Sequence, residues 1–499
     1  MAARRDLLRL ALAAGVAPGF VRFARADGVP RFACGIASGS PHAQGMVLWT
    51  RLTGPGLADA VEVRWELAHD EAFSQIAARG RETALEADAH TVHAEAAGLA
   101  ADRGYFYRFH ALGQTSPVGR TRTAPAADAA VARLDFVIAS CQRWDHGHFA
   151  AWRHAVADAP DLVFFLGDYL YEYSTARDPV REVTGGPTKS LGQYRARYAL
   201  YKTDPALQAA HAACPWIVIA DDHEVENDHA GSQSQTLAPD FDTRRAAAYR
   251  AWWEHMPLPK AARAVGPAVR MHGRLDWGRL ARAHWLDTRQ WRDPQACPQP
   301  GRGGSNTVHP QDCAALADPR RSLLGATQER WLAEGWDLKR PWNLLAQTTL
   351  MAPFHRRDGK VWTDGWSGYA PARARLLGTV AERRVPGVVV LGGDVHANYV
   401  ADLHADVDDP KSPIVASEFC GTSISSLSWA QRAIDASLPL NPHIHLGRSD
   451  RRGYGHFRLD ARQLQATLRV VDDATDPDSG ASTLARFAVE AGRPGPQAA

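Results

Sequence analysis

Four short segments of the sequence end an apolar run with side chains that can bind metal ions or move protons. They are Ser140-Cys141-Gln142 after F-V-I-A, Gly167-Asp168 after V-F-F-L with Tyr171 three residues later, Asp221-Asp222-His223-Glu224 after W-I-V-I-A, and Gly393-Asp394-Val395-His396 after V-V-V-L. Taken singly, a Gly-Asp pair is ordinary loop capping, and a cysteine after a strand is ordinary packing. The combination of a thiol, a phenol, several acids and two histidines is far more specific, and it predicts a metal centre.

The types of these side chains indicate which metals they suit. A thiolate and a phenolate, from Cys141 and Tyr171, stay deprotonated beside a strong Lewis acid such as Fe³⁺. Carboxylates and the amide of Asn227 suit a harder divalent ion, Ca²⁺, Mn²⁺ or Mg²⁺. Asp168 is central in the sequence order and is the natural bridge between two ions. Two metal ions about 3.5–4 Å apart clamp a phosphate and activate water, which predicts a phosphoester hydrolase.

The elements that must position these groups follow from the hydrophobic pattern. Over residues 131–475, near-continuous apolar strands alternate with helical segments, which predicts a sheet covered by helices on both faces. In a parallel or mixed sheet, the four strand ends lie at one edge, within reach of each other. Residues 31–123 show short alternating runs bounded by Gly, Pro or Asp, which predict a small antiparallel β-sandwich domain. We expect residues 476–499 to form a C-terminal tail.

The first 26 residues are typical of an export signal. Arg4 and Arg5 precede a short, weakly apolar run, and Ala24-Arg25-Ala26 offers a small-x-small cleavage site. The paired arginines favour the twin-arginine translocation machinery, while a frayed amphipathic helix stays the alternative. The apolar run is too short to span a bilayer, and no later segment qualifies. We therefore expect a periplasmic or secreted protein without a transmembrane segment in the mature chain.

The composition limits the classes of binding partner that we expect. The 499-residue chain has a formal net charge of +2 and no dense Lys/Arg run after its N-terminus, so no nucleic-acid partner is evident. Its six cysteines show no CxxC zinc pattern. Cys297 and Cys313 flank a Pro/Gly-rich loop and are candidates for a disulfide in an oxidising compartment.

The motifs S-C-Q, G-D-Y-L-Y-E, D-D-H-E-V-E-N and G-G-D-V-H resemble those of the alkaline phosphatase D (PhoD-like) family of calcineurin-like metallophosphatases. The resemblance spans roughly residues 32–471. It implies an α/β, four-layer metallophosphatase fold, with two stacked mixed β-sheets flanked by helices, preceded by a small N-terminal antiparallel β-sandwich. It also implies hydrolysis of phosphate monoesters or diesters by a metal-activated hydroxide, with Fe³⁺ and Ca²⁺ as cofactors.

Carried over by position, the resemblance assigns ligands to each metal. The Fe³⁺ ligands are Cys141, Asp168, Tyr171 and His396. The calcium ligands are Asp168, Asp222 and Asp394, with Asn227 or Asp221 as a further contributor. Two positions depart from the family's usual pattern without removing a ligand. Ala220 stands where a tryptophan is usual, and Asp228 replaces an asparagine that often follows Asn227.

Three further side chains are expected to act on the substrate, a small-molecule or lipid phosphoester. His223 suits a general acid or electrostatic partner at the leaving group. Arg289 and Arg292 suit the substrate phosphate, because a guanidinium grips it in bidentate fashion; ordinary ion pairs are the alternative for both. A phospholipase D-like phosphodiesterase, a non-catalytic extracytoplasmic scaffold and an iron redox enzyme remain other readings. The sequence leaves the ester class and the oligomeric state open.

Overall fold

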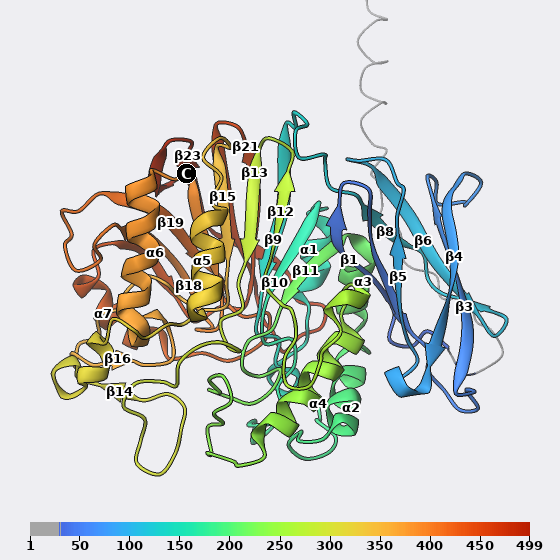
Figure 1. Ribbon diagram of the computed structural model, residues 1–499, viewed down its shortest axis with the longest axis horizontal. Helices are drawn as coiled ribbons and strands as arrows, with labels where there is room; N and C mark the ends of the chain where they lie inside the picture. Colours follow the sequence, from blue (N-terminus) through green and yellow to red (C-terminus); the bar gives the residue numbers. More distant parts are fainter. Residues whose placement is uncertain (1–28, 30) are drawn as a thin grey trace, which may run out of the picture.

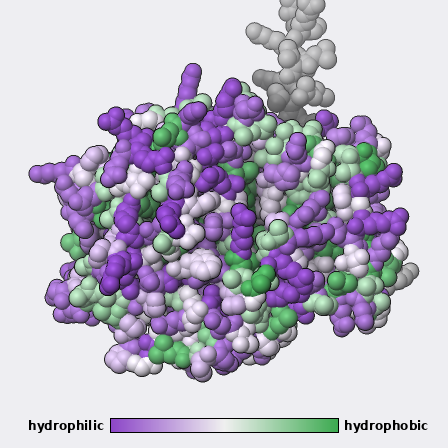
Figure 2. Space-filling view, viewed as in Figure 1, coloured by the Kyte–Doolittle hydropathy of each residue, from purple (hydrophilic) through white to green (hydrophobic). Residues whose placement is uncertain are grey.

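The computed structural model describes residue 29 and residues 31–499. The expected export signal, residues 1–26, lies outside the described residues. Two large β-sheets are stacked, and helices cover the outer side of each (Figure 1). Figure 2 shows that hydrophilic residues cover most of the same face, with hydrophobic ones in small scattered groups. Within the part of the chain described, no helix has both the length and the apolar character needed to cross a membrane.

The larger sheet has the strand order β24-β23-β22-β21-β9-β10-β11-β1-β2-β5. Strands β9, β10, β11 and β1 run parallel, and antiparallel strands flank them on both sides. The bounds are β1 (Ile36–His42), β2 (Gly45–Arg51), β5 (Thr91–Ala96), β9 (Arg133–Ala139), β10 (Leu162–Leu166), β11 (Pro215–Ile219), β21 (Gly453–Asp460), β22 (Gln463–Val471), β23 (Ala481–Glu490) and β24 (Arg493–Ala498).

The second large sheet has the order β12-β13-β15-β17-β19-β18-β20. Its central strands β13, β15, β17 and β19 are parallel, and the outer ones are antiparallel. The bounds are β12 (Gly273–Trp277), β13 (Ala281–Trp285), β15 (Trp342–Ala346), β17 (Val388–Gly392), β18 (Asn398–His404), β19 (Ile414–Cys420) and β20 (Ile444–Arg448). A small ribbon pairs β14 (Thr307–Val308) with β16 (Val361–Trp362).

Burial on both faces explains the continuous apolar strands. In β15, Leu344 and Ala346 lie in the core between the two sheets, whereas Leu345 lies in the core beneath the outer helices. Successive strand residues point to opposite faces, so each face needs its own apolar set. Helices α1 (Ala151–Ala157), α2 (Leu191–Tyr201), α3 (Pro205–Ala213) and α4 (Phe241–His255) lie on the side of the larger sheet; α5 (Gly325–Gly335), α6 (Ala370–Arg383) and α7 (Gln431–Ser437) lie on the other (Figure 1). The four-layer α/β fold is confirmed.

The N-terminal sandwich is present, but one of its layers continues into the larger sheet. A five-stranded sheet contains β3 (Ala60–Ala68), β4 (Ile76–Leu85), β6 (Gly104–Ala111), β7 (Gln114–Thr115) and β8 (Gly119–Arg122). It shares one core with β1, β2 and β5. Strand β1 also pairs in parallel with β11, with Ser38 opposite Pro215. This pairing satisfies backbone groups that would otherwise form an open edge.

The last residues of the chain are strands rather than a free tail. Within residues 476–499, β23 and β24 complete one edge of the larger sheet. Phe487 and Val489 are buried in the main core, because alternate residues of β23 face inward. The burial of these two side chains gives this segment a packing role that its sequence pattern did not indicate.

Candidate active site

The predicted site residues meet where the carboxyl ends of strands from both large sheets converge. Cys141 follows β9, Asp168 follows β10 and Asp222 follows β11, all in the larger sheet. Asp394 and His396 follow β17 of the second sheet. The groups therefore converge as expected, but across two stacked sheets rather than along the edge of one.

Sharp backbone turns aim these side chains at the centre. The φ angles of Cys141, Asp168, Asp394 and His396 are 59°, 59°, 64° and 52°. Non-glycine residues rarely adopt this left-handed conformation, which costs on the order of 1–3 kcal/mol each and clusters at functional sites. Gly167 precedes Asp168 with φ 98°, and a Cβ on it would lie 2.5 Å from the Asp221 Cβ.

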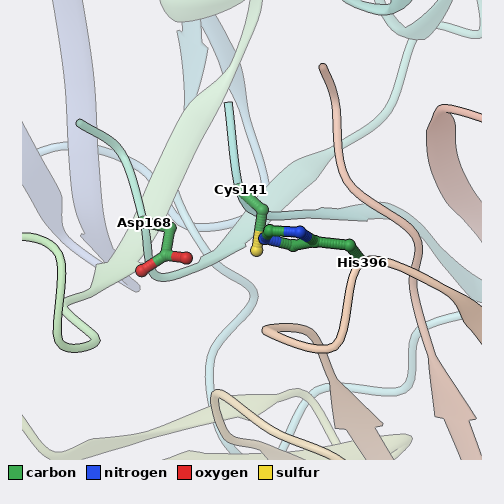
Figure 3. Close-up of side chains that lie close together, drawn as sticks. All are labelled: Cys141, Asp168 and His396. Atoms are coloured by element: carbon green, nitrogen blue, oxygen red, sulfur yellow. The ribbon is translucent and has the colours of Figure 1, made fainter. Parts of the chain in front are cut away.

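The first cluster joins all four predicted iron ligands. Cys141, Asp168 and His396 each offer a ligand atom, and these atoms lie within 4.8 Å of one another. In Figure 3 they come from three separate segments and gather at one point. The Tyr171 hydroxyl donates to Asp168 Oδ2 at 2.9 Å and lies 2.9 Å from His396 Nε2. His396 Nδ1 lies 2.6 Å from the Leu427 carbonyl oxygen, which places the proton on Nδ1 and leaves Nε2 free to bind a metal.

Outer side chains hold this cluster in place. The Ser426 hydroxyl donates to the Cys141 carbonyl oxygen at 2.8 Å, and lies 2.8 Å from the Tyr171 hydroxyl. The Glu224 carboxylate accepts from the backbone N–H groups of Asp168 and Asp221 at 3.1 and 2.7 Å. Sequence reasoning assigned no role to either side chain, because nothing in their local pattern shows what they contact.

Of the remaining predicted ligands, Asp222 is grouped with Asp168, and other contacts place Asp394 and Asn227. Asp168, Asp222 and His223 form a second group whose ligand atoms lie within 4.8 Å, so Asp168 belongs to both groups. Asp394 Oδ2 accepts from the Thr349 hydroxyl at 2.8 Å. The backbone N–H of the half-buried Asn227 donates to the Glu172 carboxylate at 2.7 Å.

The charge of the cluster fits bound cations. Burial raises the pKa of Asp394 well above its ordinary value, and the neighbouring carboxylates of Asp221 and Asp222 raise it further. Burial and Asp168 likewise raise the pKa of the Cys141 thiol. Asp168 Oδ1 and Asp221 Oδ2 are buried and find no hydrogen-bond partner among the described residues. Acids packed this way stay ionised beside compensating positive charge, so the donor set fits a metal pair.

His223 is held by an acid that sequence reasoning left unassigned. Its Nδ1 lies 2.6 Å from Glu172 Oε2. Burial opposes the charged imidazolium, but Glu172, Asp222 and Asp168 outweigh it and raise the pKa of His223 well above its ordinary value. In the sequence, Glu172 is one acid within G-D-Y-L-Y-E-Y, and no local signal separates it from a packing residue.

Arg289 and Arg292 are buried and already paired. The Arg289 guanidinium contacts Asp221 Oδ1 at 2.5 Å and Asp364 Oδ2 at 2.8 Å, and Arg292 contacts Asp364 Oδ1 at 2.8 Å. Arg289 also lies 3.7 Å from Asp222. These contacts favour the ion-pair reading, in which the arginines position acids of the site. Asp364 lay outside any strand pattern, so the sequence did not single it out.

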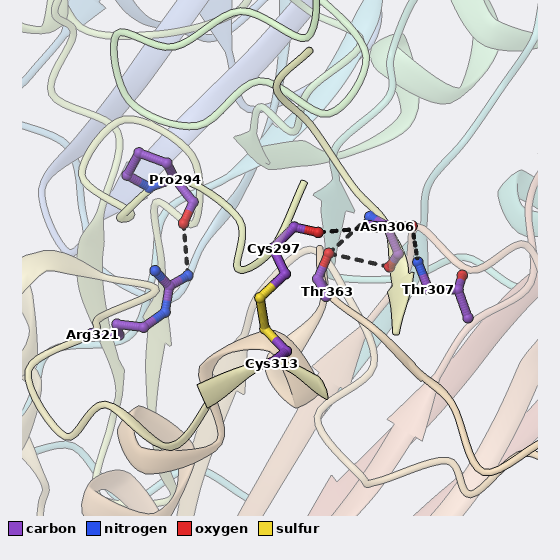
Figure 4. Close-up of a disulfide and its surroundings, with 7 residues drawn as sticks. All are labelled: Pro294, Cys297, Asn306, Thr307, Cys313, Arg321 and Thr363. Carbon is purple, nitrogen blue, oxygen red and sulfur yellow. Dashed lines mark hydrogen bonds between the residues drawn. A yellow bond between two sulfur atoms is a disulfide. The ribbon is translucent and has the colours of Figure 1, made fainter. Parts of the chain in front are cut away.

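The Pro/Gly-rich loop contacts the site at Asp228, one of the two positions that depart from the family's usual pattern. A disulfide joins Cys297 and Cys313, as the sequence indicated (Figure 4). Within this loop, the Ser305 hydroxyl donates to Asp228 Oδ2 at 2.6 Å. Asp228 also forms a third acidic group with Asp222 and Asp364. The extra acid is thus tied to both the loop and the predicted metal ligands.

Comparisons with known proteins agree with this architecture. The family model of the PhoD-like phosphatase matches residues 136–468, and that of the PhoD-like phosphatase N-terminal domain matches residues 16–125. Alkaline phosphatase D of Bacillus subtilis (strain 168) is 40% identical over 477 residues, covering 91% of this chain and 80% of that protein. A solved structure described as "Structure of PhoD" has a TM-score of 0.88 and 37% identity, covering 97% of this chain and 93% of that one. The chain therefore belongs to the PhoD-like phosphatase family.

Proposed function

We propose that the protein is a metal-dependent phosphoric ester hydrolase, acting as an alkaline phosphatase or phosphodiesterase. The observation that supports this most directly is the convergence of the Cys141, Asp168 and His396 donor atoms within 4.8 Å. Membership of the PhoD-like family and the name of the Bacillus subtilis relative support the same reaction class.

The donor atoms divide into two sets by their chemistry. Cys141, Asp168, Tyr171 and His396 would hold Fe³⁺, because thiolate, phenolate and imidazole suit it. The Ca²⁺ set, which would also accept Mn²⁺ or Mg²⁺, is Asp168, Asp222, Asp394 and Asn227. When bound there, the two ions supply the Lewis acidity that activates water and neutralises the phosphate.

His223 would protonate the leaving oxygen. Its Nδ1–H faces Glu172, so its Nε2 side is left for the substrate. As the bond between phosphorus and the leaving oxygen breaks, the Nε2 proton passes to that oxygen and the alcohol departs neutral. Arg289 and Arg292 would act through the acids that they hold, Asp221 and Asp364.

We also propose that the protein is exported and that its substrates fall into one chemical class. The Arg4-Arg5 pair and the small-residue cleavage site support export through the twin-arginine machinery to the periplasm or medium. The substrate is a small-molecule or lipid phosphoester. A phosphodiester such as a phospholipid uses the same site and would give phospholipase D-like activity. Fractionation of cells expressing the wild type and an Arg4→Lys, Arg5→Lys variant tests export.

The hydrolase proposal is tested on purified protein. We expect release of phosphate from p-nitrophenyl phosphate or of p-nitrophenol from its diester, loss of activity with a chelator, and iron in the elemental analysis. Cys141→Ala and Asp168→Asn should abolish turnover. If these variants hydrolyse as well as the wild type, the site assignment is wrong, and an active wild type without iron would refute the iron assignment.

A further inference from the structure

A small aromatic pocket is lined by residues that adjoin the proposed metal ligands. Its volume is about 60 Å³, and five aromatic side chains line it: Phe354, Trp362, Trp366, Tyr399 and Trp429. A cavity needs about 10–15 Å³ to hold one water molecule, so this space suits a few methylenes or the inserted edge of a ring. Trp429 is 51% exposed, although most large aromatic side chains in this chain are buried. A partly exposed aromatic wall is typical of a ligand site rather than of a folding core.

One hydrogen bond and two chain adjacencies connect this aromatic pocket to the predicted metal ligands. Thr349 lines the pocket and donates its hydroxyl to Asp394 Oδ2 at 2.8 Å. Val395 also lines it and lies between Asp394 and His396 in the chain. Trp429, which also lines the pocket, comes two residues after Leu427, whose carbonyl oxygen accepts from His396 Nδ1 at 2.6 Å. The walls of the pocket thus adjoin the residues of the proposed metal centre.

One ion pair lies beside the pocket. The Arg356 guanidinium lies 5.8 Å from the centroid of the Trp429 ring and 3.2 Å from the Asp358 carboxylate. Because Asp358 balances the charge of Arg356, the apolar wall rather than a net charge would hold the organic group. The carboxylates of the metal centre, by contrast, offer nothing that holds an apolar group.

We propose that this aromatic pocket is a specificity subsite for the organic group of the substrate. It favours phosphoesters whose alcohol portion is apolar and no larger than an aromatic ring over esters of small polar alcohols such as glycerol. This inference rests on the proposed function, since it assumes that a phosphoester binds at the metal centre.

A binding experiment tests the pocket separately from turnover. Phenylphosphonate and methylphosphonate resemble phosphoesters but are not hydrolysed, and calorimetry gives the Kd of each for the metal-loaded protein. We expect the wild type to bind phenylphosphonate about 3- to 10-fold more tightly, as one aromatic contact predicts. Trp429→Ala and Phe354→Ala should remove this preference, and Trp429→Phe should restore part of it.

A kinetic experiment uses the same variants. The ratio of kcat/KM for phenyl phosphate to that for glycerol 2-phosphate should fall about 3- to 10-fold in Trp429→Ala, mainly through KM. Comparing this ratio between variant and wild type cancels the different reactivities of the two esters. Trp291→Ala is the matched control, because Trp291 is 54% exposed and does not line the pocket.

The outcomes separate the two proposals. Retained phosphate release with no preference for the phenyl group, or a preference that survives both alanine substitutions, overturns the subsite and leaves the proposed function standing. A wild type that releases phosphate from no ester overturns the proposed function and this inference with it. An equal loss on both esters in Trp429→Ala also overturns the subsite, because it shows a general structural effect.

Discussion

His223 and Glu172 form a buried pair, with Nδ1 of the imidazole 2.6 Å from Oε2 of the carboxylate, although they are 51 positions apart in the chain. The side chains are only 10% and 2% exposed. The carboxylate fixes the ring's orientation and tautomer, as acids commonly do for catalytic histidines. Glu172 is therefore a positioning residue, which acts on the substrate only through His223.

The first prediction concerns the leaving group. Replacing His223 with Ala should slow hydrolysis of an alkyl phosphate about 10²- to 10⁴-fold, the usual worth of general acid catalysis. The loss should be much smaller with p-nitrophenyl phosphate, because p-nitrophenolate departs without a proton. Glu172→Gln should show the same selectivity with a smaller loss. Steady-state kinetics on both esters measure it, and an equal loss on both would remove His223 from the role of acid.

The second prediction concerns the support of the iron ligands. Ser426→Ala removes the hydroxyl that contacts Tyr171 and the Cys141 carbonyl. Losing such an outer contact typically lowers metal affinity or activity about 10- to 100-fold. Metal titration followed by elemental analysis measures the change. Ser425→Ala is the control, since the Ser425 hydroxyl donates to the Arg143 carbonyl oxygen instead; similar affinities in both variants would contradict the assignment.

The third prediction separates positioning from phosphate binding. Arg289→Ala leaves Asp221 buried without its partner and removes one of the two arginines that pair with Asp364, which should lower the free energy of unfolding by about 3–5 kcal/mol. Urea unfolding measures this. Arg320→Ala, which breaks an exposed pair with Asp318, should leave stability unchanged. A raised KM at unchanged stability would instead support direct contact between Arg289 and the phosphate.

The fourth prediction concerns the disulfide. Cys297 and Cys313 are 16 positions apart, and closing a loop of this length stabilises the folded state by about 3 kcal/mol. Cys297→Ser combined with Cys313→Ser should lower the free energy of unfolding by a similar amount. It should also expose residues 298–312 to limited proteolysis, with metal binding weakened through the Ser305–Asp228 contact. An unchanged cleavage pattern would show that other contacts order the loop.

The fifth prediction concerns pH and stability away from the site. Burial raises the pKa of Glu418 from its ordinary 4.5 to about 7, although the N–H groups of Met351 and Ala352 oppose this. Between those two pH values the folded protein binds more protons than the unfolded chain, so stability falls as pH rises, by about 3 kcal/mol. Glu418→Gln should flatten this fall in urea unfolding series. Parallel curves for variant and wild type would refute it.

Local patterns predicted most of the fold. The apolar strands and the helices between them follow from hydrophobic periodicity. The acids come directly after the apolar runs, where a buried strand has to end. The disulfide between Cys297 and Cys313 could also be predicted, because the two cysteines flank one loop. Strands β23 and β24 could not be predicted in this way, because only the folded core shows which of their residues face inward.

The sequence by itself determined which donor atoms are available, since a thiol, a phenol, acids and imidazoles follow strands whose ends must face a loop. Only the tertiary structure decided that two sheets share the site, that Glu172 orients His223, and that Arg289 and Arg292 are occupied by acids. These relationships join residues tens to hundreds of positions apart. Their energies depend on burial and distance, which local periodicity does not encode.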